Sequence, residues 1–167
     1  RRSLERAILA PNSSNLQLWE FYRVKTDKKK EELATFCFGQ PAASTANELI
    51  VFVTRRDHWK SHNQWIVNNI KKGANGDDES IKGALFYYEK LIPDLYKKGI
   101  PFITDMVKQL MMAWRGRKKV SPREVTYTDT RIIVHKSTAL AAENFMLSMK
   151  AEGYDSCPME GFDSVRV

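Results

Sequence analysis

The spacing of apolar residues in the first third of the chain predicts a helix, a strand, a second helix and a second strand. A short helical face spans residues 4–8 and ends at Pro11, because proline cannot continue a helix. Aromatic and β-branched residues predict a strand over residues 19–25, and a helix around residues 33–37 follows with its apolar side turned inward. The continuous apolar run 49–53 predicts a buried central strand.

From residue 58 to residue 119 the pattern is helical. A loop at residues 73–78 separates two helical segments, and Gly99 with Pro101 marks a second break. A third segment carries the clearest amphipathic stripe of the chain. Its apolar members are Ile103, Met106, Val107, Leu110, Met111 and Trp114.

Residues 130–152 carry two conflicting signals. The run 131–134 is typical of a strand, whereas the later apolar residues have the spacing of a helix. These residues are Ala139, Ala142, Phe145, Met146 and Met149. Gly153 suits the left-handed position that closes such a helix. In the turn-rich loop that follows, Pro158 stiffens the chain and Gly161 admits close approach of a ligand to the backbone.

Length and composition limit the possible classes of protein. The 167 residues, 43% of them apolar, predict a single domain over residues 1–167, with a helical excursion at about 58–119. No signal-peptide pattern and no apolar run of the roughly 20 residues that a membrane span needs is visible. We therefore expect a soluble cytoplasmic protein with no membrane partner. Cys37 and Cys157 are expected to be reduced, with Cys157 a small buried packing residue.

Much of the net charge of +7 lies in two basic runs, residues 28–30 and 115–119. Each run adjoins a predicted helix end, and positive charge near a helix C-terminus complements the helix dipole. No nucleic-acid-binding motif is present, so we expect no nucleic-acid partner. A basic surface could equally attract a phosphorylated cofactor such as a pyridine nucleotide.

A cluster of amides and hydroxyls that begins at Pro11 is the main candidate for a binding site. The run 12–15 supplies more hydrogen-bond donors and acceptors than the local backbone can use. Such a cluster suits a polar planar ligand. A turn capped by an asparagine side chain is the simpler interpretation, and both stay open at this point.

Other chemistries have weaker support. His58 and His62 lie one helical turn apart, but no third ligand has suitable spacing, so we predict no metal site. Ser13 and Ser14 lack the Gly-x-Ser-x-Gly elbow of a hydrolase, and no Gly-rich phosphate loop occurs.

Four segments together resemble the FMN-dependent nitroreductase family. They are Arg1-Arg2-Ser3, Pro11 to Phe21, Ala141 to Leu147 leading to Gly153, and Cys157 to Asp163. The resemblance implies an α+β fold in which helices surround a mixed β-sheet. It also implies an intertwined homodimer with two FMN sites at the subunit interface, and small-molecule electron acceptors as further partners.

The resemblance assigns the cofactor contacts position by position. The segment that meets the FMN phosphate and pyrimidine edge corresponds to Arg1, Arg2 and Ser3. The stretch that packs on the flavin of the partner subunit corresponds to Pro11, Asn12, Ser13, Asn15 and Gln17. The loop along one face and edge of the isoalloxazine ring corresponds to Pro158, Met159, Glu160 and Gly161. A backbone N–H near Glu160 then points at flavin N5, and Gln40 adds a ring contact.

In such enzymes the cofactor carries the chemistry, so no catalytic side chain is expected. FMN takes a hydride at N5 from NAD(P)H and passes electrons to nitroaromatic, quinone or similar acceptors in a ping-pong cycle. Aromatic residues of the helical excursion either shape the acceptor pocket or belong to the core. They are Trp59, Trp65, Phe86, Tyr87 and Trp114.

The chain departs from the family pattern at two points. Relatives have a longer stretch between the equivalents of Ser3 and Leu4, and they continue past the equivalent of Asp163 into a further strand and a tail. We therefore expect that parts of the family pattern are missing from this sequence. Two alternatives stay open: another flavin enzyme of the same fold, such as a reductive dehalogenase, or a non-catalytic basic helical binding module.

Overall fold

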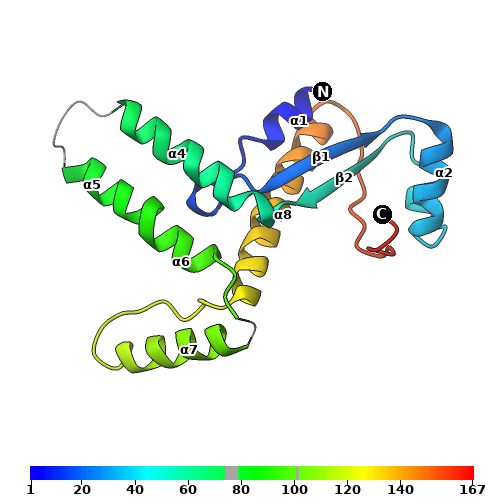
Figure 1. Cartoon of the computed structure of the whole chain (residues 1–167). Helices are drawn as coiled ribbons and strands as arrows, with labels where there is room; N and C mark the ends of the chain where they lie inside the picture. The colour runs from blue at the N-terminus through cyan, green and yellow to red at the C-terminus, as the bar shows by residue number, and fades with distance from the viewer. Residues whose placement is uncertain (74–78, 101) are drawn as a thin grey trace. The chain divides into compact units, whose positions relative to one another are not determined.

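A computed structural model of the chain describes residues 1–73, 79–100 and 102–167 (Figure 1). The predicted loop after Gly73 and the predicted break at Pro101 therefore lie outside the described residues. Helices make up most of the described chain and accompany a small antiparallel sheet, which confirms the predicted α+β class. No helix in the described ranges has the length and apolar character to cross a bilayer.

The described chain divides into two compact units. Unit 1 consists of Arg1–Pro11, Trp19–Thr54 and Thr138–Val167, and unit 2 consists of Asn12–Leu18 and Arg55–Ser137. The helix α8 (Tyr127–Ala151) contributes residues to both units. The assignment of residues 1–167 to a single FMN-binding domain stays a prediction.

Unit 1 contains both predicted strands. Its other elements are α1 (Arg2–Ala7), α2 (Asp27–Phe36), α3 (Pro41–Ser44) and the second part of α8. The strand β1 (Trp19–Val24) pairs antiparallel with β2 (Leu49–Thr54), with Trp19 opposite Thr54 and Val24 opposite Leu49.

The expected buried central position of β2 differs from what the structure shows. Within the described chain β2 has one neighbouring strand, β1, and Leu49 is its one buried residue. Aromatic packing accounts for Phe52, because its ring lies 4.7 Å from that of Phe21 and 5.5 Å from that of Phe145. This residue of the apolar run therefore packs on α8.

The two signals in residues 130–152 resolve in favour of a helix. The backbone N–H of Asp129 donates to Thr126 Oγ1 at 3.1 Å, and the N–H of Thr126 donates to Asp129 Oδ2 at 2.9 Å. This reciprocal capping starts α8 at Tyr127, and the β-branched run 131–134 is helical within it. At the other end Gly153 has a φ of +86° and the Tyr154 N–H donates to Met149 O at 3.0 Å, as predicted for a closing glycine.

Among its described residues, unit 2 consists of helices and turns, and helices occupy most of the range 58–115 as its pattern predicts. Its elements are the 3-10 turns η1 (Ser13–Asn15) and η2 (Arg56–His58), α4 (Trp59–Gly73), α5 (Glu79–Phe86), the π-helical turn η3 (Tyr87–Leu91), α6 (Ile92–Tyr96) and α7 (Ile103–Arg115). The core of this unit consists of Leu16, Leu18, Ile92, Tyr96 and Val134, with Trp59 and Tyr88 packed against it. Leu16 and Leu18 thus anchor the short stretch 12–18 among the helices.

The amphipathic helix α7 turns its apolar stripe outward. The six stripe residues named above are exposed by between 46% (Met106) and 72% (Trp114). Its polar side forms hydrogen bonds to other segments of unit 2. Lys108 Nζ donates to Asp94 O at 2.7 Å, and Asp105 Oδ1 accepts from the Tyr127 N–H at 3.1 Å. The periodicity correctly predicts the helix but not the direction in which its apolar face points.

Candidate functional site

The loop of residues 12–17 has a strained backbone. Ser14, Asn15 and Gln17 have φ values of 56°, 50° and 50°, in the left-handed region that residues with a side chain seldom occupy. Each such residue costs of order 1–3 kcal/mol, and the conformation persists only where the surrounding structure holds it. Strain of this kind is common at ligand-binding sites.

Hydrogen bonds within unit 2 hold this loop in place. Asn12 Oδ1 accepts from the Gln17 N–H at 2.8 Å, which closes the loop on itself. The Ser13 N–H donates to Ser137 Oγ at 3.2 Å, and His62 Nδ1 bonds to Leu16 O at 2.7 Å. Asn12 therefore closes the loop through its side chain, but this side chain forms no capping hydrogen bond to η1. The side chains of Ser13, Asn15 and Gln17 are exposed.

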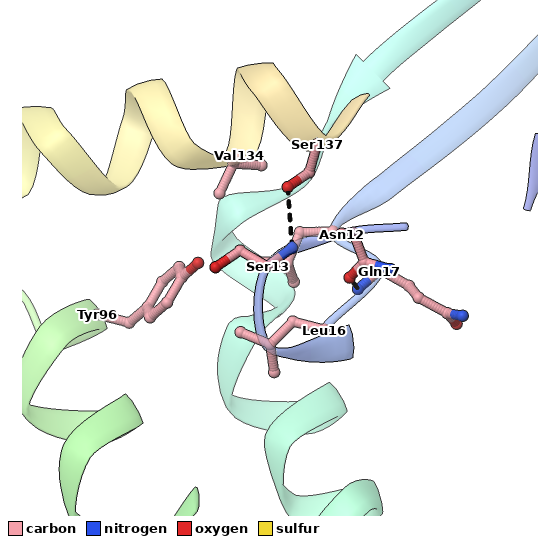
Figure 2. A pocket seen from close by; sticks show the side chains of 8 residues that line it. Asn12, Ser13, Leu16, Gln17, Tyr96, Val134 and Ser137 are labelled. Atoms are coloured by element: carbon pink, nitrogen blue, oxygen red, sulfur yellow. Dashed lines mark hydrogen bonds between the residues drawn. The ribbon is translucent and has the colours of Figure 1, made fainter. Parts of the chain in front are cut away.

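A shallow depression lies beside the loop (Figure 2). It is lined by Asn12, Ser13, Leu16, Gln17, Leu18, Tyr96, Val134 and Ser137. The depression has no room for a water molecule, so it cannot enclose a ring system.

Tyr96 adds a polar group to this depression that the sequence did not single out. The Tyr96 ring is 3% exposed and stacks on Trp59 at 6.0 Å, and burial raises the pKa of its hydroxyl to about 12. The hydroxyl therefore stays protonated at neutral pH. Figure 2 shows this hydroxyl and the side chain of Ser13 pointing toward one another.

In unit 1 the structure brings Gln40 to the predicted ring-contact loop 158–161. Gln40 Nε2 donates to Gly161 O at 2.7 Å and to Cys37 O at 3.0 Å. A Cβ on residue 161 would lie 2.9 Å from Gln40 Nε2, so only glycine fits there without displacing the amide. Gly161 thus serves a close approach of the Gln40 side chain in this structure.

The loop 158–161 is also anchored by packing. Met159 packs against the small cluster of Ala34, Cys37 and Ala43, and the Asp163 N–H donates to Phe36 O at 2.9 Å. Glu160 is exposed, and no acceptor for its backbone N–H occurs among the described residues. This N–H is therefore available for an added hydrogen bond.

The N-terminal segment divides into exposed and buried groups. The guanidinium groups of Arg1 and Arg2 are on the surface, where Arg1 pairs with Glu5 at 2.8 Å and Arg2 with Glu152 at 3.4 Å. Exposed pairs of this kind contribute little to stability and can be exchanged for a phosphate. Ser3 is buried, and its hydroxyl accepts from Ser148 Oγ at 3.1 Å.

The two cysteines are free thiols in different environments. Cys37 is buried, which raises the pKa of its thiol. Cys157 is exposed, so the expectation that it is a buried packing residue is wrong. The physical reason is its place in the irregular segment after α8, which packs through Met159 instead.

The histidines do not converge with other ligands. The rings of His58 and His62 lie 5.7 Å apart, and His62 bonds to the backbone of Leu16. Within the described ranges, no group of three or more His, Cys, Asp or Glu side chains is placed to hold a metal ion.

Comparison with known sequences gives one family for the whole chain. The model of the nitroreductase family matches residues 1–167. A Staphylococcus haemolyticus protein named "Putative NAD(P)H nitroreductase SH0546" is 28% identical over 165 residues, which are 98% of this chain and 63% of that protein. Protein DrgA of Synechocystis is 25% identical over 167 residues, all of this chain and 62% of DrgA. The chain thus spans about 63% of the length of the curated relatives that it matches.

Solved structures show the same fold. The nitroreductase-fold protein YdfN of Bacillus subtilis has a TM-score of 0.69 and 20% identity, covering 98% of this chain and 64% of that chain. A structure from Exiguobacterium sibiricum, solved in complex with FMN, has a TM-score of 0.58 and 20% identity, covering 99% of this chain and 65% of that chain. At this level of identity the likeness concerns the fold.

Proposed function

Because the chain belongs to the nitroreductase family, we propose that it is an FMN-dependent oxidoreductase that takes electrons from NAD(P)H. The observation that carries this proposal is the match of the family model to every residue of the chain. The FMN bound in the Exiguobacterium sibiricum structure of the same fold supports the choice of cofactor. Nitroaromatics, quinones or similar small molecules are the proposed electron acceptors.

The residues present fit a flavin nucleotide. The exposed guanidinium groups of Arg1 and Arg2 offer planar forks for the phosphate, and Ser3 supports their helix through Ser148. The loop 158–161, braced by Gln40, offers the available N–H of Glu160 to the edge of the ring. These groups all belong to unit 1.

A second set of proposed contacts lies in the loop that follows Pro11. The exposed side chains of Ser13, Asn15 and Gln17 offer amide and hydroxyl groups, and Asn12 fixes the loop that carries them. We assign these contacts to the flavin of a partner subunit. The outward apolar stripe of α7 supports a homodimer, because an exposed apolar helix face often marks a protein contact.

When bound, FMN supplies the hydride chemistry. The chain's own residues would orient it and balance its charge. The Glu160 N–H can fix the ring edge by donating a hydrogen bond, and the positive charges of Arg1 and Arg2 favour an anionic phosphate. The packing of Met159 on Ala34, Cys37 and Ala43 anchors the loop that carries Glu160.

Four of the five aromatic residues proposed to shape the acceptor pocket remain available for that role. Trp65, Phe86, Tyr87 and Trp114 are exposed by 68%, 59%, 39% and 72%. Trp59 instead packs on the core of unit 2, where it stacks on Tyr96. We therefore retain the four exposed aromatic residues, but not Trp59, as candidates for contact with a planar acceptor.

Titration of the purified protein with FMN and with riboflavin tests the proposal. The protein should bind FMN, and the bound flavin should bleach when NADH or NADPH is added without oxygen. Replacing Arg1 and Arg2 together by alanine should weaken FMN binding by about tenfold or more while leaving riboflavin binding unchanged, since riboflavin has no phosphate.

Arg23→Ala is the matched control, because Arg23 is an exposed, ion-paired arginine of the same unit. It should leave the affinities for both flavins unchanged. A colourless protein that binds neither flavin and instead binds DNA with steep salt dependence would favour the basic helical module over the enzyme.

A further inference from the structure

Between α5 and α6 the helix widens into the π-helical turn Tyr87–Leu91. Such a turn inserts an extra residue and is often found at functional sites. Here it directs two consecutive tyrosines to one target, the loop 12–17. The rings of Tyr87 and Tyr88 meet edge to face, with their centroids 5.1 Å apart.

Both tyrosine hydroxyls bond to Ser14. The Tyr88 hydroxyl donates to Ser14 O at 3.1 Å, and the Tyr87 hydroxyl lies 2.7 Å from Ser14 Oγ. Ser14 has a left-handed backbone, with a φ of 56° and a ψ of 18°. The strained residue at the tip of the loop is therefore held at its backbone and at its side chain.

The π-helical turn is itself supported by groups of α4. A widened turn leaves carbonyl groups without their usual helical partners, and Asn63 Nδ2 donates to one of them, Tyr88 O, at 2.8 Å. Asn63 is buried, and its Oδ1 has no hydrogen-bond partner among the described residues. Lys71 pairs with Glu89 of the turn at 2.6 Å.

Asn63 therefore uses its side-chain donor to support the carbonyl group of Tyr88. The hydroxyl of Tyr88 is suited to a permanent donor role. Burial, with the nearby Tyr87 as a smaller cause, raises the pKa of Tyr88, so the hydroxyl keeps its proton at neutral pH.

We propose that Tyr87 and Tyr88 are positioning residues that hold the loop 12–17 in the shape that presents Ser13, Asn15 and Gln17 to the flavin. The tyrosines act through Ser14, which they bond directly. This inference rests on the proposed function for the identity of the ligand. The hydrogen bonds that define the loop shape do not depend on that identity.

Flavin affinity is the first test. Tyr88→Phe and Tyr87→Phe should each raise the dissociation constant for FMN by about fivefold to tenfold, the effect of losing one hydrogen bond. Ser14→Ala removes the same bond as Tyr87→Phe. A variant that carries both Ser14→Ala and Tyr87→Phe should therefore bind FMN no more weakly than either single variant. Tyr22→Phe is the control, because it removes a hydroxyl that bonds to Glu20 in unit 1.

Hydrogen exchange of the Gln17 amide is the second test and needs no flavin. This amide donates to Asn12 Oδ1 only when the loop has the observed shape. Its exchange should be faster in Tyr88→Phe than in the wild type and unchanged in Tyr22→Phe.

Each outcome decides the inference. Unchanged FMN affinity in both tyrosine variants, with the wild type binding FMN, overturns it. A wild type that binds no FMN contradicts the proposed function, and the exchange of the Gln17 amide then decides whether the tyrosines hold the loop. Equal exchange in the wild type and Tyr88→Phe overturns the inference in either case.

Discussion

Tyr96 couples the stability of unit 2 to alkaline pH. Burial raises the pKa of Tyr96 from its ordinary value of 10 to about 12. A group whose pKa is raised by folding contributes stability that is complete below the unfolded-state pKa and is lost as pH rises through the folded-state pKa. The free energy of unfolding should therefore fall between about pH 10 and pH 12.

Urea unfolding at several pH values from about 8 to about 12 measures this effect, because this range begins below the unfolded-state pKa and reaches the folded-state pKa. Tyr96→Phe should flatten the decline, because phenylalanine has no proton to lose. Tyr154→Phe, at an exposed tyrosine, should keep the decline of the wild type. A Tyr96→Phe variant with the same slope as the wild type would show that another group causes the loss.

At the residue scale, local patterns could not predict which distant side chains lie together. Gln40 and Gly161 are 121 positions apart in the chain, and periodicity gives no signal for their contact. The tyrosines at 87, 88 and 96 were not predicted to contact the loop 12–17 or its depression. Tyrosine at helical spacing usually indicates a core face, and no sequence signature announces a π-helical turn.

Two exposed glycines allow opposite predictions at the scale of single helices. Gly83 lies within α5, where a Cβ would meet no atom within 4 Å, whereas Gly153 closes α8 with a φ of +86°. Gly83→Ala should stabilise the protein by roughly 1 kcal/mol through helix propensity. Gly153→Ala should destabilise it by roughly 1–2 kcal/mol, because alanine is strained at positive φ.

Denaturant unfolding of both variants checks these values. Each variant is the control for the other, because both substitutions add one methyl group. Equal effects of the two substitutions would contradict the closing role of Gly153. The position of Gly153 was predictable, because glycine after a long apolar periodicity is a common helix end.

The start of α8 was predictable from a signal that the apolar pattern concealed. Thr126 and Asp129 form a capping box three residues apart, and this box marks a helix start directly ahead of the β-branched run 131–134. Strand propensity depends on a partner, and a helix start depends only on its own residues.

At the scale of the whole molecule, α7 tests the proposed homodimer. Leu110 is 63% exposed within the outward stripe, and a glutamate there would place a charge in any apolar contact. Leu110→Glu should raise the dissociation constant of the dimer at least about tenfold. Sedimentation velocity over a range of protein concentrations measures this change.

Leu9→Glu is the comparison, because Leu9 is an exposed leucine, 77% exposed, outside α7. It should leave the dissociation constant of the dimer unchanged. Equal self-association of Leu110→Glu and the wild type would exclude this stripe from the contact. The direction of the stripe was not predictable, since periodicity reveals that a helix has an apolar face but not what that face meets.

The path of the chain limits how the protein can be dissected. Unit 2 takes two of its five core residues, Leu16 and Leu18, from a seven-residue excursion of the N-terminal part of the chain. A fragment of residues 55–137 would lack Leu16 and Leu18, so its core would contain cavities at their positions. A fragment ending at residue 54 would keep these leucines but expose their side chains to water. Joining 12–18 to 55–137 through a designed linker would be needed to isolate the helical half as a folded piece.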